Sequence, residues 1–189
     1  MRRPTQDRMT SPASTARPKP AHSRRLQFLL RDSAVIEGRV QIGEDQSLVL
    51  FLNSRRGGWV NLTRARRSKG DEYPGHMILQ TDHVVIASAP EKDVGVSGSQ
   101  LMGTLERAVE IVLVGGKMIQ GALHAAPQQR LSDVVAASGR FVGVTGAIML
   151  PESHALGDIA LHTGAISFVR DLRSDGTTPI EEETSAKYY

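Results

Sequence analysis

The sequence predicts a mainly β protein that consists of two tandem five-stranded small barrels, each with a short inserted helix, between disordered termini. Short runs rich in Val, Ile and Leu alternate with Gly-containing turns, which is typical of short antiparallel strands. This pattern occurs twice at nearly constant spacing, which indicates an internal repeat. The flanking stretches are rich in Pro, Ser, Thr and charge and have no apolar periodicity, so a packed core is not expected there.

Composition divides the 189 residues into five segments. Residues 1–24 are expected to form a disordered basic tail, and residues 174–189 a disordered acidic tail. The two barrel repeats are expected at residues 25–90 and 107–173. Between them, residues 91–106 are rich in Gly, Ser, Asp and Lys and are expected to be a flexible linker.

The two repeats match in register. Ile36-Glu37-Gly38 recurs as Ile119-Gln120-Gly121, at an offset of 83 residues. After one residue is lost from a loop the offset becomes 82, and the matched Gly, Thr and aromatic positions then continue to the end of the repeat. We interpret this as a tandem duplication. The matches at offset 82 are residues 59–65 with 141–147, 77–81 with 159–163, and 84–86 with 166–168.

Each repeat predicts the same order of elements. In the first repeat the expected strands are 26–30, 35–42, 58–66, 76–81 and 83–89, with a short helical segment at 47–53. In the second repeat they are 109–114, 118–124, 141–150, 158–163 and 165–170, with a helical segment at 130–137.

Particular residues justify particular elements. Gly38 and Gly121 lie inside the second strand of each repeat, where a glycine predicts a bulge or a sharp bend of the kind that a small barrel needs. Ser132-Asp133 supplies residues suited to the start of a helix. The last two strands are separated by Asp82 or Gly164 alone, which predicts an abrupt corner.

The opening of the second repeat, V-E-I-V-L-V-G-G-K-M-I-Q-G-A-L, resembles the first strands of an Sm-like domain. The strand–corner–strand pattern at 159–168 resembles the end of that domain. The resemblance implies a five-stranded, SH3-like barrel. Separately, R-L-S-D-hydrophobic at 130–134, followed by F-V-x-V-T-x-A, is similar to an uncharacterised bacterial domain family. The corners Thr81-Asp82 and Thr163-Gly164 depart from the Arg/Lys-Gly pair with which Sm proteins bind uridine, so that pocket is not carried over.

The first repeat has a basic cluster that the second repeat lacks. At offset 82 its positions fall on uncharged residues, so the fold itself does not require the charge. Such a cluster can contact the phosphates of a nucleic acid or an acidic protein surface, or it can be a solvated strand end. Both interpretations stay open. The cluster consists of Arg55, Arg56, Arg64, Arg66, Arg67 and Lys69.

The second repeat is apolar where the first is basic, at Ile148, Met149 and Leu150. These residues are candidates for an interface with the other repeat or with a partner chain, and extension of the core is the alternative.

No residue pattern indicates catalysis, a metal site or a cofactor. The chain has no cysteine, which excludes disulfides and thiolate chemistry. Its six histidines lack metal-ligand spacing, and no His is placed to activate Ser132. The longest apolar runs are about six residues, against the roughly 20 that a membrane span needs. We therefore expect a cytoplasmic protein that is not an enzyme.

Two functions remain as hypotheses. The first is a non-enzymatic assembly or adaptor protein in which the paired barrels form a scaffold for a protein partner or for self-association. The alternative is an RNA- or DNA-binding module that uses the basic tail and the basic cluster. The eight Phe, Trp and Tyr residues offer few rings for stacking on bases.

Overall fold

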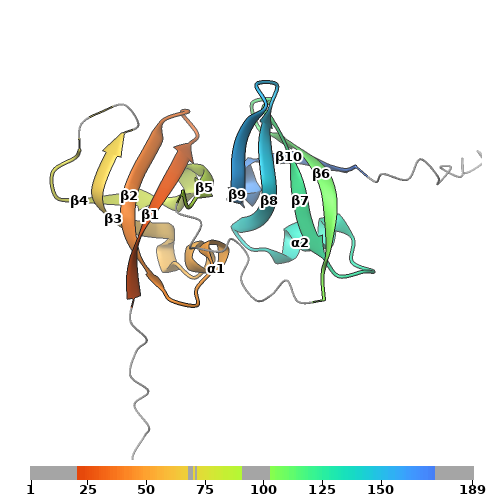
Figure 1. Cartoon of the computed structure of the whole chain (residues 1–189), viewed down its shortest axis with the longest axis horizontal. Coiled ribbons are helices and arrows are strands. Elements are labelled where there is room, and N and C mark those ends of the chain that lie inside the picture. Colours follow the sequence, from red (N-terminus) through yellow and green to blue (C-terminus); the bar gives the residue numbers. More distant parts are fainter. Residues whose placement is uncertain (1–20, 68–69, 71, 91–102, 173–189) are drawn as a thin grey trace, which may run out of the picture.

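The computed structural model describes residues 21–67, 70, 72–90 and 103–172 (Figure 1). Within these residues the protein is mainly β, as predicted, with short helices. Ten antiparallel strands form one sheet that does not close, in the order β10-β6-β7-β8-β9-β5-β1-β2-β3-β4. We call residues 21–88 the first half and residues 105–171 the second half; the two lie side by side in Figure 1.

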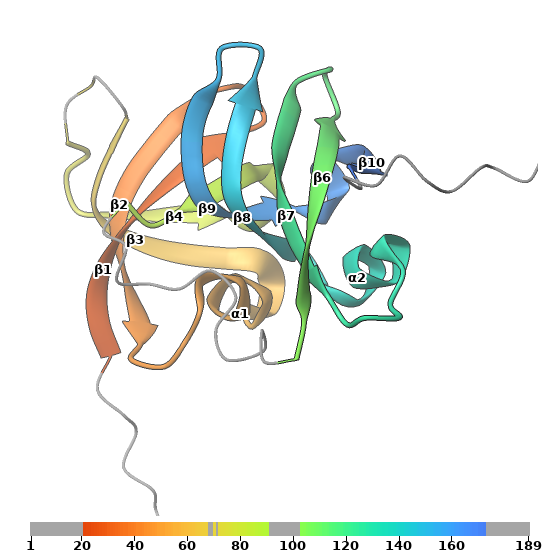
Figure 2. The same ribbon diagram turned by 45° about the vertical axis from the view of Figure 1, so that its right-hand side comes forward.

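The elements follow the predicted order. The first half contains β1 (Ala21–Leu30), β2 (Val35–Gly43), α1 (Leu48–Asn53), β3 (Trp59–Arg67), β4 (His76–Gln80) and β5 (Val84–Ser88). The second half contains β6 (Leu105–Leu113), β7 (Met118–Ala125), α2 (Leu131–Ala137), β8 (Phe141–Leu150), β9 (His154–His162) and β10 (Ile166–Asp171). Both helices lie at the same end of the strands (Figure 2).

Strand pairing has the same register in the two halves. Leu26 of β1 is opposite Gly38 of β2, and at offset 83 Val109 of β6 is opposite Gly121 of β7. The same correspondence holds for every other pair of neighbouring strands within a half. Representative equivalent pairs are Ile36↔Arg67 and Ile119↔Met149, Trp59↔Gln80 and Phe141↔His162, and Leu29↔Ile86 and Val112↔Phe168.

Both strand glycines mark the predicted irregularity. The pairing of β2 with β3 shifts between Glu37 and Arg39, and that of β7 with β8 shifts between Gln120 and Ala122. A Cβ atom at Gly121 would lie 2.7 Å from Val144 Cγ1 and 3.0 Å from the Thr145 carbonyl oxygen. The close approach of β8 to β7 therefore depends on the missing side chain.

The hydrophobic core forms two clusters that cross the boundary between the halves. The first cluster contains Phe28, Phe51 and Leu62 of the first half together with Phe141 of the second. The second cluster contains Ile86 of β5 with the buried residues of β6 to β9. Neither half therefore completes its core from its own strands.

Three strands begin earlier than the sequence predicts. β1 begins at Ala21, inside the predicted basic tail, because residues 21–24 pair with the last residues of β2. β6 begins at Leu105, inside the predicted linker, where it pairs with Ala125. β9 begins at His154, which pairs with Met149 across the β8–β9 hairpin. The rest of both predicted tails and most of the linker lie outside the described residues.

The two strand glycines differ in the room available for a side chain, which gives a matched test. We expect Gly121→Ala to lower the free energy of unfolding by about 1–3 kcal/mol, because the new methyl group meets backbone as well as a side chain. Gly38→Ala should cost less, since its Cβ would meet the Leu62 side chain at 3.1 Å. Urea denaturation of both variants measures the difference. An equal loss would contradict this account of the bend.

Candidate interaction surfaces

The two halves are joined by strand pairing between β5 and β9. Ala87 is opposite Ala160, with one further pair on each side. Both alanines are fully buried, which lets the two strands approach closely. This junction makes the sheet continuous from one half to the other. The flanking pairs are Ile86↔Leu161 and Ser88↔Ile159.

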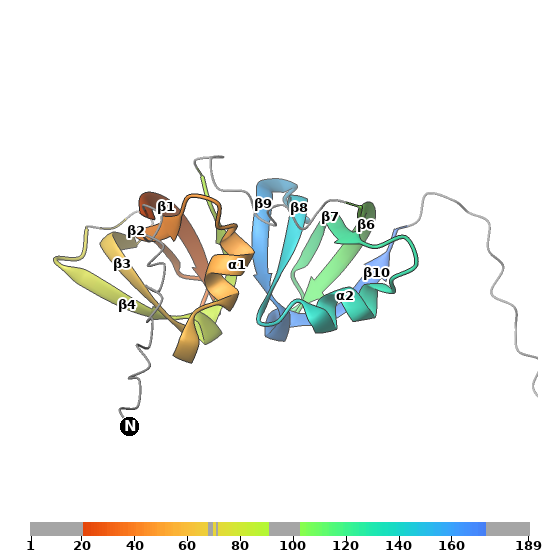
Figure 3. The same cartoon turned by 90° about the horizontal axis from the view of Figure 1, so that it is seen from below.

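The side chain of Asn53 also links the two halves, through hydrogen bonds. This residue ends α1, which lies between the strands of the first half and β8 and β9 (Figure 3). The Asn53 side-chain amide donates to the carbonyl oxygens of Ser138 at 2.6 Å and Phe141 at 3.0 Å, and its oxygen accepts from the Phe141 N–H at 2.9 Å. One side chain thus satisfies three backbone groups of the other half. No local sequence signal distinguishes this Asn from an ordinary helix end.

A polar corner closes one end of the junction. The His162 ring packs edge-on against Phe141, and its Nδ1 accepts a hydrogen bond from the Gly164 N–H at 3.0 Å. Its Nε2 lies 4.0 Å from an Asp82 carboxylate oxygen. Within the described part of the chain this Nε2 and the hydroxyl of Thr81 are buried without a hydrogen-bond partner. The corner is therefore a costly place for a charge.

The electrostatics of His162 follow from these surroundings. Burial lowers the pKa of His162, and the positive charge of Arg31 lowers it further. The carboxylate of Asp82 acts in the opposite direction and Arg140 again lowers the pKa. The neutral imidazole is consequently the form that the folded junction favours.

Met149, one of the three predicted interface residues, lies at the boundary between the halves. It lines a groove of about 220 Å³ with Leu29 and Ile86 of the first half and Leu156 and Ile159 of the second. Ile148 is exposed on β8, and Leu150 is half-buried at the end of that strand. The groove residues beside Met149 come from strands far away in the chain, and its role as an interface residue stays a prediction.

The described cations of the predicted basic cluster lie at both ends of β3. Arg55 and Arg56 precede β3, whereas Arg66 and Arg67 end it, so the nine-residue strand separates the two pairs by about 25–30 Å. The guanidinium of Arg55 lies 4.0 Å from the centre of the Phe51 ring. Arg64 and Arg67 are exposed, and Lys69 lies outside the described residues.

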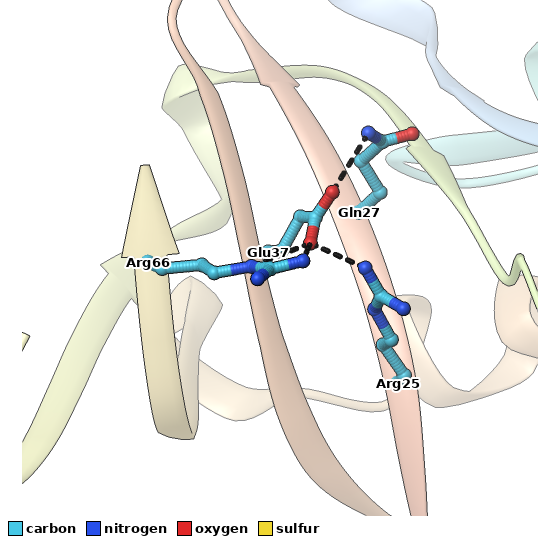
Figure 4. A network of polar contacts seen from close by, with 4 residues as sticks. All are labelled: Arg25, Gln27, Glu37 and Arg66. Carbon is cyan, nitrogen blue, oxygen red and sulfur yellow. Dashed lines mark hydrogen bonds and ion pairs between the residues drawn. The ribbon is translucent and has the colours of Figure 1, made fainter. Parts of the chain in front are cut away.

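Glu37 binds one member of this cluster tightly (Figure 4). Its carboxylate accepts from Arg66 at 2.7 and 2.9 Å and from Arg25 at 2.6 Å, and Gln27 reaches it from β1 at 3.4 Å. The hydrogen bonds from Arg25 and then Arg66 lower the pKa of Glu37. Arg66 is thus partly neutralised within its own chain, so Arg64 and Arg67 are the more available cations.

The two outer strands of the sheet are apolar and exposed. β4 forms one edge, at the outer side of the first half, and β10 forms the other, within the second half (Figures 1 and 3). Ile78 on β4 is 63% exposed and Phe168 on β10 is 55% exposed. Unpaired edge strands that carry large apolar side chains are the usual place for another strand to add. The alternation of side chains between the two faces of a strand could have indicated from the sequence that Ile78 and Phe168 are exposed. Their position at an edge of the sheet depends on the strand order, which the sequence does not reveal.

The described residues contain no group of three or more His, Cys, Asp or Glu side chains that could hold a metal ion. Among the same residues, no helix is long and apolar enough to cross a membrane. Comparisons with protein-family models, curated proteins and solved structures give no match to this chain.

The pKa of His162 predicts a pH dependence of stability. Because this pKa lies below the unfolded value of about 6.5, the unfolded chain takes up the proton first, and stability should fall as the pH drops below about 6.5. His162→Gln should remove this part of the dependence. Urea unfolding between pH 5 and 8 measures it, above the range in which Glu37 begins to lose its charge. His83→Gln, an exposed position at the same corner, is the control. An unchanged slope in His162→Gln would contradict the assignment.

Proposed function

We propose that this chain is a non-enzymatic assembly protein, composed of two related Sm-like, SH3-like small barrels, that joins copies of itself head to tail. The duplicated-barrel interpretation is supported by the repeated register, in which equivalent residues pair at offsets of 83 and 82. On this view each half is one five-stranded unit, and the scaffold is a row of such units.

The observation that carries the proposal is the junction between β5 and β9. β5 is the last strand of the first half, and its equivalent in the second half is β10. β9 is the fourth strand of the second half, and its equivalent in the first half is β4. The two unpaired edges of the sheet are therefore the same two strand positions that already pair inside the chain. The end of one copy is complementary to the start of the next.

The internal junction also predicts the register between copies. Ala87 pairs with Ala160, and the equivalents of these residues are Val169 on β10 and Ile78 on β4. Phe168 would then lie opposite Leu79, and Arg170 opposite Met77. Assembly would cover the exposed side chains of Ile78 and Phe168 and satisfy the free backbone groups of both edges. Because the two surfaces differ, the contact is heterologous and yields a closed ring or an open filament.

The alternative, a nucleic-acid-binding module, has weaker support. Arg66 is held by Glu37, and Arg55 lies over Phe51. Arg55 and Arg56 stand at the other end of β3 from Arg67. Among the described cations of the cluster, a phosphate backbone would therefore meet Arg64 and Arg67.

Charged substitutions at the two edges test the proposal. We expect Ile78→Lys and Phe168→Lys each to be monomeric, because a lysine on either edge opposes strand addition. A mixture of the two should form a 1:1 dimer and nothing larger, since the first variant keeps an intact β10 and the second an intact β4. Light scattering coupled to size-exclusion chromatography measures each species.

The control is Leu50→Lys, which changes an exposed apolar residue on α1, away from both edges, and should assemble like the unmodified chain. If either edge variant alone still dimerised, an isologous contact would replace the head-to-tail one. If the unmodified chain stayed monomeric at high concentration, the proposal would be wrong.

Engineered cysteines test the register, because the chain has no cysteine of its own. A mixture of Ile78→Cys with Val169→Cys should form disulfide-linked dimers, since opposite residues of antiparallel strands have Cα separations of about 4.5–5.5 Å, within reach of a disulfide. The control is the double variant Ala87→Cys with Ala160→Cys, which should close the equivalent bond inside one chain. Cross-linking that is as efficient between Phe168→Cys and Ile78→Cys would contradict the register.

A further inference from the structure

We propose that the acidic C-terminal segment of one copy docks on Arg64 and Arg67 of the next copy, so that charge selects which chain ends join. This inference rests on the proposed head-to-tail pairing. It assigns a partner to the exposed cations at the end of β3 that the fold does not need.

The register places the two charged segments together. With Arg170 opposite Met77, the next residue of β10, Asp171, lies opposite His76 of the neighbouring copy. His76 pairs in its own chain with Thr63, and Arg64 to Arg67 continue β3 beyond that point. In this pairing the last described residues, Asp171 and Leu172, therefore lie beside the basic end of β3. Two strand spacings, about 10 Å, separate them from β3, which the long Arg64 and Arg67 side chains can span.

The charges of the two segments are opposite. Residues 174–189 contain one lysine, and their acidic residues are Asp175, Glu181, Glu182 and Glu183. At the end of β3, the Glu37 carboxylate holds Arg66 by an ion pair, and the Arg66 backbone pairs with that of Glu72 in an isolated bridge. Arg64 and Arg67 remain exposed to receive an acidic segment.

The backbone at Arg64 supplies an independent argument. Arg64 has φ of +50°, a left-handed conformation that is strained for a non-glycine residue. The equivalent residue of the second half is Gly146, with φ of +59°. The first half thus keeps a long cationic side chain where the fold favours glycine. Strain of this kind, retained at an exposed position, points to a contact made by the side chain.

The internal junction has no such charges at the equivalent positions. There β5 is followed by Ala89 and Pro90, and β8 carries Gly146 and Met149 in place of Arg64 and Arg67. Ser88 and Met149 line the same groove, so the end of β5 and the end of β8 do lie together at this junction. The same geometry between copies would bring the segment after β10 to Arg67. One scaffold therefore has an apolar contact inside the chain and an electrostatic contact between chains.

A single-junction dimer tests the inference with directional controls. In the mixture of Ile78→Lys and Phe168→Lys copies, the first copy supplies β10 and its acidic segment, and the second supplies β4 and the arginines. Changing Glu181, Glu182 and Glu183 to Gln in the Ile78→Lys copy should raise the dimer Kd roughly tenfold at about 20 mM salt. The same change in the Phe168→Lys copy should have no effect. Analytical ultracentrifugation measures each Kd.

The complementary change replaces the arginines by their counterparts in the other half. Arg64→Gly with Arg67→Met in the Phe168→Lys copy should weaken the dimer by a similar factor, and combining it with the glutamine changes should add little, because both remove one interaction. At about 0.5 M salt the differences should disappear. The substitutions use residues that this fold already accepts, so loss of folding is not expected.

Three outcomes would overturn the inference. The first is an unchanged Kd when the Ile78→Lys copy loses its three glutamates, with the dimer otherwise intact; head-to-tail pairing would then stand without the charge contact. The second is additive weakening by the two sets of changes. The third is tight binding of a single-stranded RNA that needs Arg64 and Arg67, together with a dimer Kd that does not depend on them. Failure of the two edge variants to form any dimer would overturn both the inference and the proposed function.

Discussion

The pairing of β5 with β9 is the contact on which the rest of the architecture depends. Each half has five strands, and in the first half their order is β5-β1-β2-β3-β4. Pairing of the two outer strands, β5 with β4, would have closed the sheet within the half. Instead the last strand of the first half pairs with the fourth strand of the second, so the sheet stays open. The consequence is one free β4 edge and one free β10 edge. Phe141 of the second half belongs to the core cluster of the first half, and Ile86 of the first half belongs to that of the second. Separating the two halves would therefore expose apolar surface.

Much of the local structure could be predicted because its causes are local. Gly38 and Gly121 mark the bend of the second strand, and turn residues and apolar alternation delimit the strands and both helices. The early starts of β1 and β6 have no clear local signal, because residues 21–24 become strand through pairing with β2 and the first residues of β6 through pairing with β7. The β5–β9 junction is a pairing between distant segments, on which neither periodicity nor composition bears.

The candidate sites show the same division. Six cations within fifteen residues suggest one patch, but β3 separates Arg55 and Arg56 from Arg66 and Arg67. Glu37, which is close to Arg66 in space and not in sequence, binds Arg66. Comparison of the two repeats singles out Met149 as a residue that the fold alone does not require, and the structure places it in a groove lined by both halves. Asn53 was missed because its three hydrogen bonds are to backbone groups of the other half, and any polar residue at a helix end has the same local pattern.

The internal β5–β9 junction and the proposed β10–β4 junction between copies use the same strand positions, so either could in principle replace the other. The side chains around them argue against such an exchange. Inside the chain, Asn53 makes three hydrogen bonds to Ser138 and to Phe141 at the start of β8, each worth about 1 kcal/mol. Its equivalent in the second half is Ala136, which has no polar side chain and cannot fasten the corresponding loop of another copy. The loop itself also differs, because Arg140 has Gly58 as its equivalent, at φ of +70°. The Asn53 hydrogen bonds thus distinguish the internal junction, while exposed charge is available to distinguish the proposed junction between copies. The two contacts stay specific when the internal junction lacks the charges and the junction between copies lacks the Asn53 hydrogen bonds.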